Sequence, residues 1–87
     1  MKVEKLLSSK GKVKVLKILL RDGQANISRI VRETGLNHKR VEKHLEELKS
    51  ANIAVERRYG KLRIYEANLN NPKVLTLKKL LETLETL

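Results

Sequence analysis

The sequence predicts a mainly α-helical domain with a small β hairpin, which is an α+β fold. Four segments, residues 3–21, 26–35, 37–50 and 72–87, place apolar residues three and four positions apart, the spacing of one helix face. Two β-prone runs, residues 53–59 and 62–67, meet at Gly60-Lys61, which is a hairpin signal. The 87 residues, 40% of them hydrophobic, are enough for one small globular unit.

Residues 3–21 are expected to be mostly helical, with a bend near Ser8 and Ser9. Either serine can cap the helix that follows, because its hydroxyl can accept a hydrogen bond from a first-turn N–H. The buried stripe is expected to comprise Val13, Val15, Leu16, Ile18, Leu19 and Leu20. The outer face is expected to carry Lys10, Lys12, Lys14, Lys17 and Arg21. Gly23 supplies a left-handed cap that ends the helix.

The next two helices are joined by a glycine turn. Residues 24–26, which precede them, are too short for more than a connector or a one-bridge strand. Asn26 is placed to cap a helix that ends at Gly35, and Asn37 is placed to cap the helix of residues 37–50. Leu36, in the turn, is expected to point inward.

The helix of residues 37–50 has an apolar face and a basic face. Val41, Leu45 and Leu48 form one stripe at helical spacing. The opposite face and the first turns carry His38, Lys39, Arg40, Glu42 and Lys43. Cations at a helix N-terminus oppose the macrodipole, so a phosphate-rich partner would explain their position. A short helix of this kind suits the major groove of DNA.

The predicted hairpin collects cations near its tip, namely Arg57, Arg58, Lys61 and Arg63. Long cations on an edge strand can simply guard it against aggregation. They can also reach the backbone or minor groove of a duplex. The neighbouring helix pair favours the second interpretation.

A loop at residues 70–72 divides the chain into residues 1–70 and a C-terminal helix, residues 71–87, within one compact unit. Pro72 fits the first turn of this helix. Its apolar stripe comprises Val74, Leu77, Leu80, Leu81, Leu84 and Leu87. The helix can fold back on its own domain or pack against its counterpart in a second subunit. We favour the second alternative, because a small domain covers so much leucine with difficulty.

The formal net charge of +10 points to a polyanionic partner, such as DNA, RNA or an anionic membrane. No apolar run approaches the roughly 18 residues of a membrane span, and the start lacks a signal peptide. We therefore expect a cytoplasmic, nucleoid-associated protein without a membrane partner. The chain has no cysteine, no catalytic combination of side chains and no phosphate-binding glycine loop, so neither an enzyme nor a cofactor is expected.

Several stretches resemble the arsenic-repressor (ArsR) type of prokaryotic transcription regulator, which has a winged helix-turn-helix fold. The helix-turn-helix signature is matched by Thr34-Gly35-Leu36-Asn37, Val41, His44-Leu45, Leu48 and Ala51-Asn52-Ile53. The wing of that family is matched by Glu56-Arg57-Arg58-Tyr59-Gly60-Lys61 and Tyr65. Residues 6–16 resemble the openings of small archaeal members.

The resemblance implies a homodimeric regulator of double-stranded DNA. The recognition helix, residues 37–50, would enter the major groove, and the wing, residues 55–67, would lie on the backbone or minor groove. DNA contacts are expected from Asn37, His38, Lys39, Arg40, Glu42, Lys43, His44, Arg57, Arg58, Lys61 and Arg63. The terminal helices would form the dimer through Leu6, Leu7, Val74, Leu77, Leu80, Leu81 and Leu84.

Metal-sensing members of this type carry cysteines on the recognition helix or acidic and histidine ligands on the last helix, and neither set occurs here. His38 and His44 are six residues apart, about 600° around a helix, so they face different directions. We expect no metal and no small-molecule ligand. Two alternatives stay open: an architectural chromatin protein with weak sequence preference, and a protein-interaction module that does not bind DNA.

Overall fold

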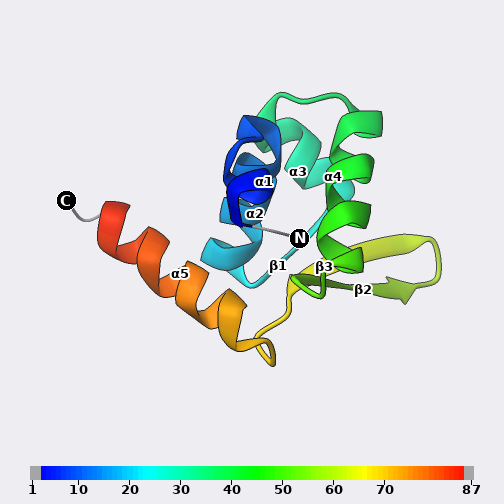
Figure 1. Ribbon diagram of the computed structural model, residues 1–87. Coiled ribbons are helices and arrows are strands. Elements are labelled where there is room, and N and C mark those ends of the chain that lie inside the picture. The colour runs from blue at the N-terminus through cyan, green and yellow to red at the C-terminus, as the bar shows by residue number, and fades with distance from the viewer. Residues whose placement is uncertain (1–2, 86–87) are drawn as a thin grey trace.

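The computed structural model describes residues 3–85, which form five helices and three strands (Figure 1). In chain order these are α1 (Val3–Leu7), α2 (Lys10–Asp22), β1 (Gln24–Asn26), α3 (Ile27–Thr34), α4 (His38–Ser50), β2 (Ala54–Tyr59), β3 (Leu62–Ala67) and α5 (Pro72–Glu85). Figure 1 shows the β2–β3 hairpin projecting to one side of α4, while α5 runs out on the opposite side of the body. This arrangement confirms the predicted α+β class.

The predicted caps set the ends of the central helices. The side chain of Ser9 accepts a hydrogen bond from the backbone N–H of Lys12, and Asn26 and Asn37 accept equivalent bonds at the starts of α3 and α4. The N···O distance is 2.8 Å in both asparagine caps. Gly35 ends α3 with φ of 74°, a left-handed conformation that a side chain would strain. These local signals fix the turn that positions α4.

The sheet has three antiparallel strands in the order β1-β3-β2. The expectation that residues 24–26 form no more than a connector or one bridge was wrong, because all three pair with residues 64–66 of β3. The physical reason is nonlocal. The free edge of β3 offers backbone donors and acceptors, and Ala25 lies buried opposite Tyr65. The sheet therefore ties the wing to the helical body.

The core is aliphatic apart from one aromatic ring. Its fully buried members are Val15, Leu16, Leu19, Ile30, Val41, Leu45, Leu48, Tyr65 and Val74. The stripe predicted on α4 is thus confirmed, and Lys39 and Lys43 on its opposite face stay exposed. Tyr65 brings the middle strand of the sheet into the same core, so the wing and α4 pack on one hydrophobic core.

Lys12 lies inside the protein, which corrects the prediction that it decorates the outside of α2. It is buried, and its Nζ lies 2.6 Å from Oε2 of Glu47 on α4. The reason is that α4 packs across this face of α2 and brings a carboxylate to it. Helical spacing carried a signal for this burial, because Lys12 is in phase with Leu16 and Leu19.

Helix α5 folds back on its own domain along one face only. Val74 is fully buried and Leu77 and Leu81 pack against the core, while Lys17 of α2 pairs with Glu85 at 2.6 Å. Three other leucines of the helix remain exposed, namely Leu75, Leu80 and Leu84. The structure thus shows the first alternative, in which the helix folds back on its own domain, and packing of the exposed face against a second subunit stays a prediction. Leu87 lies outside the described residues.

Candidate nucleic-acid interface

The N-terminal half of α4 presents an exposed, positively charged surface. His38, Lys39, Arg40 and Lys43 are all exposed. Within residues 3–85, none of these four forms an ion pair. Asn37 is exposed too, but its side-chain oxygen is occupied by the cap to Arg40. The sequence prediction of a basic α4 surface is consistent with this geometry.

The wing carries a second set of cations, and most of them are partly neutralised. Arg57 donates from Nε to Glu66 at 2.9 Å, which raises the pKa of its guanidinium, and Arg58 lies 3.3 Å from Glu56. Lys61 at the exposed tip forms no ion pair with any described residue. The turn is made by Gly60, whose φ of 63° is left-handed. The wing therefore offers its cations along an edge rather than as one cluster.

His44 was expected near the DNA backbone, but the structure buries it. The residue is 9% exposed, and neither imidazole nitrogen has a hydrogen-bond partner among the described residues. A Cβ at Gly11 of α2 would lie 2.8 Å from the His44 Nε2 atom, so the glycine makes room for the ring. Helical phase explains the error, because His44 follows Val41 by three positions and precedes Leu48 by four.

Protonation of His44 is expected to destabilise the fold. Burial, followed by the charge of Lys12, lowers the pKa of His44 below its ordinary value of 6.5. Arg40 and Lys43 act in the same direction, and Glu47 opposes them. As the pH falls, His44 therefore takes up a proton in the unfolded chain before it does so in the folded protein. The free energy of unfolding should decrease below about pH 6.5, by no more than about 1.4 kcal/mol per pH unit.

Urea unfolding at about pH 7.5 and about pH 5.5 checks this expectation, because carboxylates still contribute little in that range. His44→Leu should remove the dependence, whereas His38→Leu on the exposed surface should keep it. Equal pH dependence in wild type and His44→Leu would contradict the assignment.

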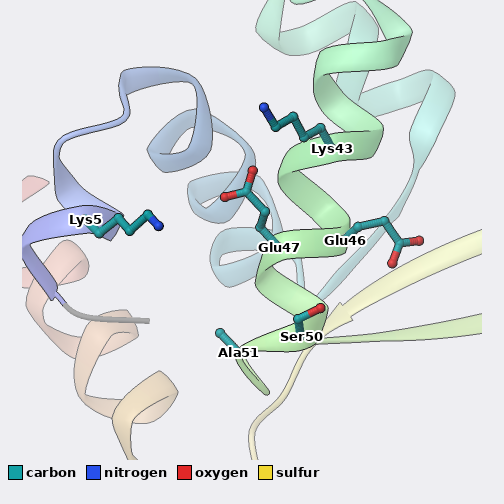
Figure 2. Close-up of a pocket in the computed structure, with 6 residues that line it drawn as sticks. All are labelled: Lys5, Lys43, Glu46, Glu47, Ser50 and Ala51. Carbon is teal, nitrogen blue, oxygen red and sulfur yellow. The ribbon is translucent and has the colours of Figure 1, made fainter.

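The acids of α4 connect it to both of its neighbours. Figure 2 shows Glu47 pointing to the side of α1 and α2, and Glu46 pointing toward the hairpin. Together with Lys5, Lys43, Ser50 and Ala51 they line a cleft of about 540 Å³ beside α1. Hydrogen bonding from Lys12 lowers the pKa of Glu47, which keeps its carboxylate charged. Glu47 thus holds α4 against Lys12 of α2, and on the other side Glu46 lies 3.5 Å from Arg63 of the hairpin.

Arg63 and Glu42 were both expected to face DNA, but they bind each other. Nη1 of Arg63 lies 2.8 Å from Oε2 of Glu42, and its Nε lies 2.8 Å from Oε2 of Glu56. Hydrogen bonds from Lys49, then from Arg63, lower the pKa of Glu56 to about 2. No local pattern in the sequence indicates that Glu56 or Lys49 belongs to this network, because the contacts join separate elements.

The residues expected in a dimer interface fall into three groups. Leu6 and Val74 are buried within the monomer and cannot present their side chains to a partner in this conformation. Leu77 and Leu81 are half-buried against the core. The exposed members are Leu7, Leu80 and Leu84. Between α1 and α5 lies a groove of about 580 Å³ that includes Leu6, Leu7, Ile53, Leu77 and Leu80 among its lining residues.

Two features are absent from the described part of the chain. Among residues 3–85 there is no group of three or more histidine, aspartate or glutamate side chains placed to hold a metal ion. None of the helices in this described range has the length and apolar character needed to cross a membrane.

Comparison with solved structures identifies the architecture. The homodimeric winged helix-turn-helix DNA-binding domain of a possible ArsR-family transcriptional regulator from Mycobacterium bovis is 25% identical, with a TM-score of 0.75 over 97% of this chain and 75% of that one. The transcriptional repressor PagR of Bacillus anthracis is 26% identical, with a TM-score of 0.74 over 88% and 85%. HlyU from Vibrio cholerae shares the fold at 18% identity, with a TM-score of 0.83 over 98% and 89%.

Comparison at the level of sequence gives two different results. No curated protein matches the chain significantly, whereas a family model does. The family model described as "Bacterial regulatory protein, arsR family" matches residues 9–55, which is more than half of the 87 residues and spans α2 to the start of β2. The chain therefore belongs to the arsR family of bacterial regulatory proteins and is a winged-helix, DNA-binding transcription regulator.

Proposed function

We propose that this regulator binds double-stranded DNA as a homodimer and recognises a specific sequence, with α4 in the major groove. The observation that carries the proposal is the exposed N-terminal half of α4, where Lys39, Arg40 and Lys43 form no ion pair with described residues. Unpaired cations on a helix whose other face is buried can be directed at base edges and phosphates. Asn37 and His38 lie at the same end of the helix and complete this surface.

The wing supplies the second contact with DNA in this proposal. Arg57, Arg58 and Lys61 lie along its exposed edge and are placed to meet the backbone or the minor groove beside α4. Phosphates can replace the carboxylate partners of Arg57 and Arg58, because exposed ion pairs are individually weak.

Dimer formation is supported by apolar surface that the monomer leaves uncovered. Leu7 on α1 and Leu80 and Leu84 on α5 are exposed, and the first two lie on the groove between these helices. The Mycobacterium bovis relative is described as homodimeric. Two α4 helices related by a two-fold axis would enter successive major grooves about 34 Å apart and read a pseudo-palindromic site.

The second candidate is an architectural protein of the same fold with weak sequence preference. The net charge of +10 and the lysines of α4 favour it, because lysine is a flexible donor that grips phosphates as readily as bases. No particular surface of the described residues favours a third candidate, a protein-interaction module without DNA binding.

Selection of bound sequences from a random duplex library distinguishes these functions. A sequence-specific homodimer should enrich a palindromic consensus with half-sites about one helical turn apart. Footprinting on the recovered duplex should then show two protected major-groove faces. Uniform recovery of unrelated sequences, with nearly equal affinity and a steep salt dependence, would reject sequence specificity and support the architectural candidate.

A further inference from the structure

We propose that Arg63 is a positioning residue rather than a DNA contact: it holds the wing against α4 and keeps the carboxylate of Glu42 away from the duplex. The inference rests on the proposed binding of DNA by α4 and the wing. It concerns which residues of that surface touch DNA and which arrange the others.

All three nitrogens of the Arg63 side chain point into the protein network. Nε donates to Glu56 at 2.8 Å, Nη1 donates to Glu42 at 2.8 Å, and Nη2 donates to the hydroxyl of Tyr65 at 2.6 Å. The side chain is 24% exposed, compared with 66% for Arg58, its cross-strand partner. A guanidinium whose donors are occupied in this way has little left to offer a phosphate.

The network is anchored on its protein side. Tyr65 is fully buried in the core, and Glu56 is also bound by Lys49 at 2.9 Å. Glu56, followed by Glu42, raises the pKa of Arg63 above its usual range, so the guanidinium stays charged. Arg63 is therefore held in place by Glu56 of β2 and Tyr65 of β3, and Lys49 of α4 in turn binds Glu56.

Glu42 is the residue that needs this partner. It lies on α4 between Lys39 and Lys43, on the surface proposed to meet DNA, and its side chain is 41% exposed. An unpaired carboxylate there would repel phosphates and weaken the attraction of Lys39 and Lys43 for them. Arg63 neutralises Glu42 from the wing, 21 residues away in sequence, and so joins the two DNA-binding elements.

A double-mutant cycle on the full chain tests this assignment. Binding is measured to a labelled duplex of about 30 base pairs, long enough for two half-sites, at several salt concentrations and well below the Tm of every variant. We expect Arg63→Met to weaken binding about tenfold, roughly 1.4 kcal/mol, because the carboxylate of Glu42 loses its partner. Glu42→Gln should change binding little on its own. When Glu42→Gln is added to Arg63→Met, it should restore most of the affinity that Arg63→Met lost, because the unpaired carboxylate is gone.

Arg58→Met is the matched control, because Arg58 lies opposite Arg63 on the hairpin and is proposed to contact phosphate. The loss of affinity caused by Arg58→Met should be the same in the wild-type and Glu42→Gln backgrounds. The slope of log K against log salt should become less negative by about 0.9 for each phosphate that is no longer neutralised. Should Arg63→Met fail to fold, Arg63→Lys serves in the same cycle, since an ammonium cannot span Glu56, Glu42 and Tyr65 together.

The outcomes separate this inference from the proposed function. If Glu42→Gln restores no affinity in the Arg63→Met background, the loss does not come from the unpaired carboxylate of Glu42, and the inference alone is overturned. Failure of the wild type to bind any duplex would overturn the inference together with the proposed function.

Discussion

Replacing Lys39 and Lys43 together with alanine is expected to weaken duplex binding at least about a hundredfold at about 0.1 M salt. Both side chains are exposed on one face of α4 and form no ion pair with described residues, so their charge is free to displace counterions from DNA. The slope of log K against log salt should become less negative by about 0.9 for each phosphate that is no longer neutralised. Fluorescence anisotropy across a salt series measures both quantities.

The matched control removes the same charge elsewhere. Lys78→Ala with Lys79→Ala takes two lysines from α5, away from α4, and should change affinity much less. If the two double variants weaken binding equally, net charge alone drives binding and the groove assignment for α4 fails. If neither variant weakens binding, α4 is not the DNA-binding element.

Removing the carboxylate of Glu47 is expected to destabilise the fold by about 2 kcal/mol, because it leaves the ammonium of Lys12 buried without its partner. The Lys12 side chain is 5% exposed and that of Glu47 is 33% exposed, which places the cost below that of a fully buried pair. Glu47→Met tests this by urea unfolding. Adding Lys12→Met should recover most of the stability, because two apolar side chains replace the stranded charge.

An exposed ion pair of the same length provides the control. Lys17 and Glu85 also lie 2.6 Å apart, but both side chains are about half exposed. Glu85→Met should therefore cost less than about 1 kcal/mol, since water already screens and solvates both charges. Similar destabilisation by Glu47→Met and Glu85→Met would contradict the view that burial, rather than distance, decides the effect.

The fold was largely predictable because its signals are local. The caps at Ser9, Asn26 and Asn37 and the left-handed turn at Gly35 each depend on residues within one helical turn, and all were anticipated. The buried stripe of α4 followed from spacing alone. Local chemistry therefore determined where each helix begins, and which side of α4 would be buried.

Lys12 and His44 are two misplaced side chains that show where residue type misleads and helical phase does not. Both were assigned to the surface because they are polar, although each lies in phase with buried leucines. Phase marks the face on which a residue lies, but it does not show that a partner exists to make burial tolerable. The burial of Lys12 is compensated by its ion pair with Glu47, whereas the ring of His44 has no polar partner among the described residues and fits into the space left by Gly11.

The sequence by itself determined the helical order, the glycine turn, the basic face of α4 and the hairpin beside it. Only the tertiary structure decided which of those cations pair with carboxylates. The Lys12–Glu47 contact joins residues 35 positions apart, and the Arg63–Glu42 contact joins residues 21 positions apart. Capping and periodicity act over a few residues, whereas an ion pair between elements depends on how those elements pack, so no local pattern shows which arginine stays exposed and which is bound to a carboxylate.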